Sequence, residues 1–380
     1  MRYVMLFSVF VFLSSCHQKE AKTKVNAEEV KDDEIIIIAD RLSITKNESF
    51  TVVKIINPWQ GAETVEFEYV LVERGNEIPP NIADSLSIIY VPLQSIICMS
   101  SSHVAMVAAL GEENKISGVS GSSFIYNEKV ARRIKAGIVK DVGYDAGLNN
   151  ELIMKIGPEL IMNYGIGAES AGYVAKLAEA GIKIMFDADY LEDDPLGKAE
   201  WIKLFGALFC KEQLADSIFK SEVEAYESVK KTIDVKISTR PNVMLGLPYK
   251  DVWYISPGNS YMSKLISDAG GKYLWEEVVS DVSMPHGLEN VFIRAMKADF
   301  WLNPGTALST DDIKAIDYRL ATLPCFNNVY NNNLRLNYSG GNDYWEIGAV
   351  HPHLILKDIA SILHPEIYGG HELLMYRKIN

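Results

Sequence analysis

The chain has few cysteines, and their spacing argues against two classes of stabilised domain. Its 380 residues include four cysteines, and none belongs to a Cys-x-x-Cys pair. Beyond Cys16, the remaining three are an odd number: Cys98, Cys210 and Cys325. Neither a disulfide framework nor a cysteine-built zinc site is therefore expected. We predict that these three side chains are buried apolar thiols.

Basic residues are also fewer than acidic residues. Lysine and arginine number 37 against 50 aspartates and glutamates, which gives a formal net charge of −13. No stripe of basic residues runs along the chain. Because nucleic-acid binding depends on such a basic surface, nucleic acid is not an expected partner.

The first residues read as a targeting segment. Arg2 precedes an apolar run over residues 3–13, which is shorter than the roughly 20 residues of a membrane-spanning helix. The run ends in Leu13-Ser14-Ser15-Cys16, which resembles a bacterial lipobox. We therefore expect a signal peptide over residues 1–16, a lipid on Cys16 and a polar tether over residues 17–33. The alternative is a plain secretory signal with a chance cysteine.

One segment occurs twice. Residues 147–165 align without a gap with residues 287–305, and both copies share Gly, Leu, Asn, Ile and a final Asn-x-Gly. Each copy reads as a short helix followed by a buried strand and a tight loop. The offset of 140 residues is too long for a solenoid, whose repeats span about 20–50 residues. The repeat predicts two similar α/β lobes that face each other.

The patterning predicts an α/β fold with two Rossmann-like lobes joined by one long helix. Apolar–polar alternation indicates a few antiparallel strands over residues 34–86. Strand–helix alternation over residues 87–213 and 239–380 predicts two lobes with largely parallel sheets. Residues 195–213 read as a helix, and residues 214–238 as a linker helix without glycine or proline.

Several passages, taken in order, resemble the class III periplasmic binding proteins of ABC importers, a helical-backbone family for cobalamin, ferric siderophores and haem. The likeness spans roughly residues 87–365. Residues 341–346 resemble the version found in Bacteroidetes-type lipoproteins. The other matching passages are residues 101–111 with 116–120, 149–151 with 158–161, 181–184, 198–202 and 268–271.

The resemblance implies a monomeric binding protein that works with an ABC permease and its ATPase. It also implies a location in the cell envelope, facing the periplasm or the cell surface. In the family, one exposed glutamate on each lobe contacts the permease; by motif these are Glu151 and Glu289. Both stand at predicted helix starts, where the helix dipole favours a carboxylate, so helix capping is the alternative role.

A ligand is expected at the loops that follow the parallel strands. These loops are rich in aromatic residues, which suit a large, flat or partly apolar metal chelate, and they have few arginines to bind an anion: Arg132, Arg133 and Arg335. The candidate ligand-binding residues are His103, Tyr126, Tyr144, Tyr164, Trp253, Tyr254, His286 and Trp345.

Three alternatives remain open from the sequence. His103 or His286 is a possible ligand to a metal in the cargo, whereas His351-Pro352-His353 reads as surface histidines without a third partner nearby in sequence. A free zinc or manganese carrier would need three or four clustered ligands. An enzyme on the same scaffold is the other alternative, but the glycine pattern at residues 165–170 is broken. We expect no enzyme activity and no resident cofactor.

Overall fold

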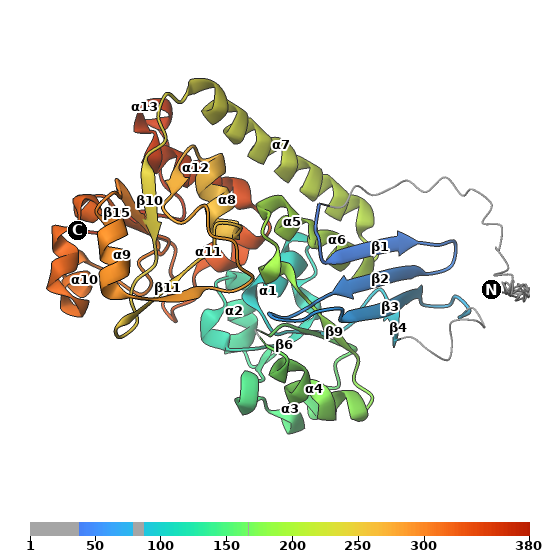
Figure 1. Cartoon of the computed structure of the whole chain (residues 1–380). Helices are drawn as coiled ribbons and strands as arrows, with labels where there is room; N and C mark the ends of the chain where they lie inside the picture. The colour runs from blue at the N-terminus through green and yellow to red at the C-terminus, as the bar shows by residue number, and fades with distance from the viewer. Residues whose placement is uncertain (1–37, 79–86, 166) are drawn as a thin grey trace, which may run out of the picture. The chain divides into compact units, whose positions relative to one another are not determined.

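Two largely parallel sheets, one in each half of the chain, form the framework of the computed structural model, which describes residues 38–78, 87–165 and 167–380 (Figure 1). Cys16 and the tether lie outside the described residues. The first lobe is built on the strand order β7-β6-β5-β8-β9, all parallel. Its strands are β5 (Ile96–Cys98), β6 (Ile116–Val119), β7 (Lys140–Asp141), β8 (Leu160–Asn163) and β9 (Ile184–Phe186).

The second lobe repeats this arrangement. Its sheet has the order β12-β10-β14-β15-β16, in which only β16 is antiparallel to its neighbour. The order β6-β5-β8-β9 in the first lobe corresponds to β12-β10-β14-β15 in the second. The strands are β10 (Asn242–Leu245), β12 (Lys272–Tyr273), β14 (Phe300–Leu302), β15 (Val329–Asn331) and β16 (Arg377–Lys378). The predicted α/β class with two similar lobes is confirmed.

The duplicated segment occupies equivalent places in the two lobes. The first copy forms α3 (Asn150–Ile156) and β8, and the second forms α9 (Leu288–Ala295) and β14. In the first copy the Asn149 side chain caps the helix by accepting a hydrogen bond from the Leu152 amide at 2.9 Å, whereas Gly287 of the second copy offers no such cap. The predicted helix-then-strand reading of the repeat is confirmed.

Helices connect the strands within each lobe. A two-stranded antiparallel ribbon, β11 (Val252–Ile255) with β13 (Met284–Gly287), is added to the second lobe. Besides α3, the helices of the first lobe are α1 (Ser101–Ala109), α2 (Glu128–Lys135), α4 (Glu169–Glu179), α5 (Pro195–Glu200) and α6 (Ile202–Leu208). Besides α9, those of the second are α8 (Tyr261–Asp268), α10 (Thr310–Ile316), α11 (Asp343–Glu346), α12 (Pro352–Leu363) and α13 (Pro365–Tyr368).

The long linker helix is α7 (Glu212–Lys236). Its inward stripe recurs every three or four residues, as an amphipathic helix requires. Ala215 and Phe219 pack in the core of the first lobe, while Tyr226, Val229 and Ile233 pack in that of the second. One helix therefore contributes to both cores. Within the described part of the chain, no helix is both long and apolar enough to span a membrane.

The single helix predicted over residues 195–213 is wrong. Trp201, which is fully buried, separates α5 from α6, and its indole donates a 3.0 Å hydrogen bond to Glu192 Oε1. Cys210 then ends α6 with a left-handed φ of 54°. Cys210 is also exposed, so the expectation of three buried thiols holds only for Cys98 and Cys325.

A four-stranded sheet precedes the first lobe, in the order β1-β2-β3-β4. The first three strands pair antiparallel, as predicted, but β4 runs parallel to β3. The inward-facing residues of this sheet belong to the same hydrophobic core as β5 and α1. The strands are β1 (Leu42–Lys46), β2 (Thr51–Ile56), β3 (Glu66–Glu73) and β4 (Ser87–Val91).

Two buried carboxylates attach the start of the described chain to the first lobe. Glu200 accepts hydrogen bonds from the amides of Ile38 and Ala39, the latter at 3.0 Å. Glu192 accepts those of Asp40 and Arg41 at 2.9 and 3.2 Å. The described residues from Ile38 onward group into one unit. The finer boundaries expected within it remain predictions.

Candidate functional site

Buried polar residues gather where the strands of the first lobe end. His103 lies at the start of α1 directly after β5, Asn163 ends β8, and Asp187 follows β9. His103 is fully buried and Asp187 is 1% exposed. In open parallel sheets, the carboxyl ends of the strands are where ligands bind. The sequence placed His103 at this edge but gave no signal for Asp187 as its partner.

His103 and Asp187 form a buried pair, and burial favours the neutral form of each group. His103 Nε2 lies 3.4 Å from Asp187 Oδ2. Burial lowers the pKa of His103 to about 4, and burial together with the neighbouring Asp189 carboxylate raises the pKa of Asp187 well above its usual range. Lys198 Nζ stands 3.9 Å from Asp189 Oδ2, so the local positive charge faces Asp189. A fully buried imidazole has no surface with which to contact cargo in this conformation.

Exposed aromatic side chains surround this edge. Phe124, Tyr144 and Tyr164 follow β6, β7 and β8 and are 57%, 59% and 38% exposed. Tyr164 meets Tyr190 edge to face at 5.7 Å, and the Tyr190 hydroxyl donates a 2.7 Å hydrogen bond to the Gly165 carbonyl. Tyr144 and Tyr164, two of the residues predicted to contact the ligand, are therefore exposed on these loops.

The corresponding edge of the second lobe is built from amides. Asn331 is fully buried, and its Nδ2 donates to the carbonyls of Gly305 and Ala307 at 2.9 and 2.8 Å. Asn333 Nδ2 reaches the same Ala307 carbonyl at 3.4 Å. Asn303, the counterpart of Asn163 in the repeat, follows β14 with a left-handed φ of 54°. Because amides do not titrate, these asparagines contribute no charge that varies with pH.

Trp253, predicted as a ligand contact, lies in the core instead. It is fully buried, its indole donates to the Leu245 carbonyl at 3.0 Å, and its ring packs on Trp301 at 5.7 Å. Trp301 in turn donates to the Gly246 carbonyl at 2.7 Å. The two tryptophans fix the end of β10, which leaves Trp253 no face for a ligand.

The other candidates of the second lobe lie nearer the surface. Tyr254 is 56% exposed, and half-buried His286 lies opposite Trp253 in the β11–β13 ribbon. Trp345, in α11, is 55% exposed and meets buried Tyr344 edge to face at 4.8 Å. Tyr254, His286 and Trp345 remain accessible candidates.

The loops after β6 and β15 touch each other. Glu346, at the end of α11, accepts hydrogen bonds from the backbone amides of Tyr126 and Asn127 at 2.6 and 2.8 Å. Burial raises the pKa of Glu346 to about 7, against the opposing effect of these two hydrogen bonds. The Arg335 guanidinium lies over the Tyr126 ring at 5.4 Å and pairs with Asp343 at 2.8 Å. Tyr126 is thus a lobe–lobe contact, and Glu346 is a partner that the sequence reasoning missed.

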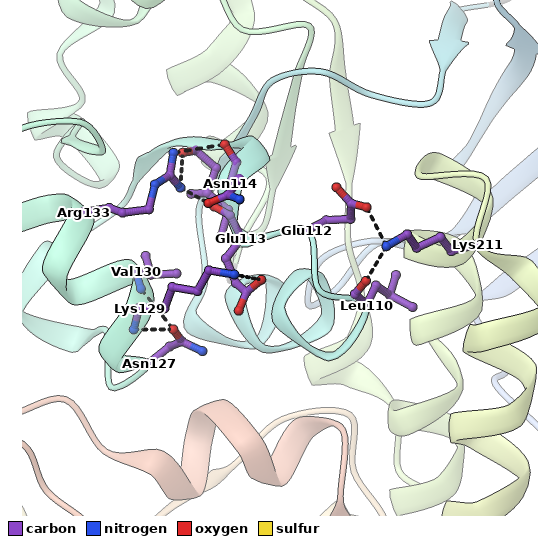
Figure 2. A network of polar contacts seen from close by, with 10 residues as sticks. Leu110, Glu112, Glu113, Asn114, Asn127, Lys129, Val130, Arg133 and Lys211 are labelled. Atoms are coloured by element: carbon purple, nitrogen blue, oxygen red, sulfur yellow. Dashed lines mark hydrogen bonds and ion pairs between the residues drawn. The ribbon is translucent and has the colours of Figure 1, made fainter.

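Arg133 is unavailable to an anionic ligand, as Figure 2 illustrates. Its guanidinium donates to the carbonyls of Glu113, Asn114 and Ile116, the last two at 3.0 Å. Lys129, which also belongs to α2, pairs with the Glu113 carboxylate at 3.0 Å (Figure 2). These contacts fasten α2 to the short 3-10 turn that precedes β6. Of the three arginines near the predicted loops, Arg133 and Arg335 are therefore already paired.

The two glutamates proposed for docking differ in their surroundings. Glu151 is exposed in the first turn of α3. Glu289, in the first turn of α9, has a side chain that is 73% exposed but pairs with Arg319 at 3.3 Å. One candidate glutamate therefore lies on each lobe, although Glu289 stands two positions earlier in the repeat than Glu151, and it has a competing partner.

The family model described as periplasmic binding protein matches residues 96–329, more than half of the chain. The chain belongs to the periplasmic binding protein family. This binding protein is 28% identical to an uncharacterized lipoprotein of Methanocaldococcus jannaschii over 86% of this chain and 81% of the relative. The family resemblance inferred from the sequence is confirmed.

Solved structures share the fold of this binding protein. A possible iron-binding (periplasmic solute-binding) protein of Staphylococcus epidermidis superposes with a TM-score of 0.56 at 19% identity, over 72% of this chain and 99% of that one. The periplasmic heme-binding protein RhuT of Roseiflexus sp. RS-1 gives 0.55 at 17% identity, over 72% and 99%.

Proposed function

We propose that this protein captures a metal-chelate nutrient, namely cobalamin, haem or a ferric siderophore, between the strand ends of its two lobes, and delivers it to an ABC permease. The observation that carries the proposal is the set of exposed aromatic side chains at these strand ends, Tyr144, Tyr164 and Trp345 among them. Aromatic faces suit a large, flat or partly apolar ligand. The names of the structural relatives, which mention iron and haem, agree with this ligand class.

The pairing of the nearby arginines favours a cargo of low negative charge. A strongly anionic catecholate chelate would call for several free guanidinium groups. Arg133 and Arg335 are instead engaged with protein groups. We therefore rank tetrapyrroles and neutral chelates above strongly anionic siderophores.

A fluorescence titration tests the ligand class. The purified full chain in detergent is titrated with cyanocobalamin, hemin and a ferric hydroxamate, and tryptophan emission is corrected for ligand absorbance. Saturable quenching by one of them supports the proposal. Tyr164→Ala and Trp345→Ala should each weaken that binding by about tenfold, the effect of losing an aromatic interface contact. Tyr318→Ala, an exposed aromatic in the second lobe away from the strand ends, is the matched control.

Transport to a permease is tested separately. We propose that Glu151 and Glu289 dock on cationic groups of the permease through charge-assisted hydrogen bonds. The double variant Glu151→Lys/Glu289→Lys should lose uptake while its chelate affinity stays unchanged, and exposed Glu63→Lys serves as control. A loss of affinity would instead assign the two glutamates to the ligand site. Cys16→Ser should release the protein from membranes if Cys16 carries the proposed lipid.

A further inference from the structure

Three side chains from distant parts of the sequence meet where the two hydrophobic cores adjoin. Glu222 lies on the inward stripe of α7, between Phe219 of the first core and Tyr226 of the second. His351 and His353 stand at the start of α12. The residues before them pack in the first core, and Ile355 packs in the second. The cluster therefore lies at the junction of the lobes, on different elements from the proposed cargo site.

The geometry of the cluster is convergent. His351 Nδ1 lies 3.1 Å and His353 Nδ1 2.7 Å from the same atom, Glu222 Oε2. The other carboxylate oxygen accepts the backbone N–H of His353 at 2.8 Å. Pro352, at the first turn of α12, contributes no N–H that would compete for the carboxylate. The interpretation of the two as surface histidines missed this third group, because Glu222 lies 129 and 131 residues away in the chain.

The charge state suits a cation. Glu222 is 1% exposed, and burial by itself raises the pKa of its carboxyl, but the hydrogen bonds from the two imidazoles and the His353 amide outweigh burial and hold the pKa below its usual value. The carboxylate is thus a buried anion. The two imidazole side chains are 33% and 25% exposed, so the open side of the cluster faces solvent.

We propose that Glu222, His351 and His353 form a binding site for a divalent transition-metal ion of the Zn²⁺ type. Two imidazole nitrogens and one carboxylate oxygen are a ligand set that such ions take, with water in the remaining positions. The three ligand atoms lie within 4.8 Å of one another. Around a tetrahedral ion with bonds of about 2.0–2.1 Å they would be about 3.3 Å apart, so shifts of a few tenths of an ångström suffice for the two short pairs.

Metal binding at these atoms balances without any further reactant. In the metal-free protein each neutral imidazole carries its proton on Nδ1 and donates it to Glu222. On binding, this proton is exchanged through water to Nε2 of the same ring, and the metal takes the Nδ1 lone pair that is freed. An imidazole that is protonated beforehand releases one proton to water.

The position of the site assigns it a structural role. A bound ion would join α7 to α12 at the point where one helix leaves the first core and enters the second. It would hold the two lobes in one relative orientation, whereas the cargo proposed above binds at the strand ends. The proposal does not depend on which chelate the protein carries.

The test uses the full chain, purified with a tag other than oligohistidine, and no chelate. Isothermal titration with ZnCl₂ near neutral pH should give one ion per chain, and Zn²⁺ in about hundredfold excess over its Kd should raise Tm by a few degrees. Co²⁺ serves as a second probe, because its visible absorption bands report nitrogen and oxygen coordination directly. His351→Gln/His353→Gln keeps a hydrogen-bond donor for Glu222 and should lower the affinity by roughly 100-fold or more.

The control is a histidine–carboxylate pair without a third ligand. His371 Nε2 lies 2.7 Å from fully buried Asp358. His371→Gln should therefore leave the Zn²⁺ titration and the Co²⁺ spectrum unchanged. Equal Zn²⁺ binding by wild type and the double variant, or no binding by wild type, would overturn the proposal. Loss of binding in Glu222→Gln, with its circular dichroism spectrum intact, supports it further.

Discussion

The two lobes share a strand order but bury different polar groups at their strand ends. The first lobe buries His103, Asp187 and Asp189, all of which can titrate, whereas the second buries Asn331 and its neighbouring asparagines, which cannot. The same topology therefore buries titratable side chains at the strand ends of one lobe and neutral amides at those of the other. A duplicated backbone sets where a site lies, but the side chains decide its chemistry.

The largest effect on the free energy of unfolding is expected from introducing a titratable group at the buried strand ends of the second lobe. Asn331→Asp replaces an amide that donates to two carbonyls with oxygen atoms that face them. An uncompensated buried charge costs about 3–5 kcal/mol of unfolding free energy. The introduced carboxyl should have a raised pKa, so the stability should fall as the pH rises from about 5 to 8. Urea denaturation at several pH values measures this dependence.

Exposed Asn327→Asp in the same lobe is the control and should be nearly neutral at every pH. If Asn331→Asp costs less than about 1 kcal/mol, the hydrogen bonds of the Asn331 amide contribute little to stability, and this contrast between the lobes is overturned.

Glu346 joins the loops at the strand ends of the two lobes, and its replacement should have the next largest effect on the free energy of unfolding. Burial raises the pKa of this carboxyl from 4.5 to about 7 in the folded state. Its contribution to stability is therefore full below about pH 4.5 and is lost as the pH rises through 7, by about 3 kcal/mol at most. Glu346→Gln should remove this slope and should also leave one of the two amides, of Tyr126 or Asn127, without its acceptor. Denaturant midpoints between about pH 5 and 8 would detect both changes, and an unchanged slope would contradict the assignment.

Asp187→Asn makes the reverse change in the first lobe and should have the smallest effect. Because burial and Asp189 raise the pKa of Asp187, the wild type loses stability as the pH rises through that raised value. The asparagine variant does not, and its amide can donate to His103 Nε2. The variant should therefore become more stable than wild type as the pH rises, by about 1–2 kcal/mol. A thermal scan in which wild type is the more stable at high pH would show that the pair is better satisfied when charged.

Local patterns predicted much of the fold, because strand–helix alternation and the repeat depend on neighbouring residues. The break at Trp201 was missed, since its cause is a contact with Glu192 rather than a glycine or proline. The site was predicted less completely. Trp253 and Trp345 both stand near loops in the sequence, and only the packing against Trp301 distinguishes the buried ring from the exposed one.

Partners far apart in sequence escaped prediction for a related reason. Glu346 binds amides 219 and 220 residues away, and Glu222 meets histidines 129 and 131 residues away. No local period encodes such pairs, because each arises only once the cores have formed. The exposed Cys210 was missed because the end of α6 turns it outward through a left-handed backbone.

The hydrogen bonds from the amides of residues 38–41 to Glu200 and Glu192 also determine which lobe is attached to the membrane anchor. With Cys16 as the proposed anchor, only residues 17–37 lie between the membrane and these hydrogen bonds, and such a segment spans at most about 70 Å when fully extended. Any pull from the membrane is then borne by the first lobe. Because α7 packs in both hydrophobic cores, the same force reaches the second lobe through this one helix.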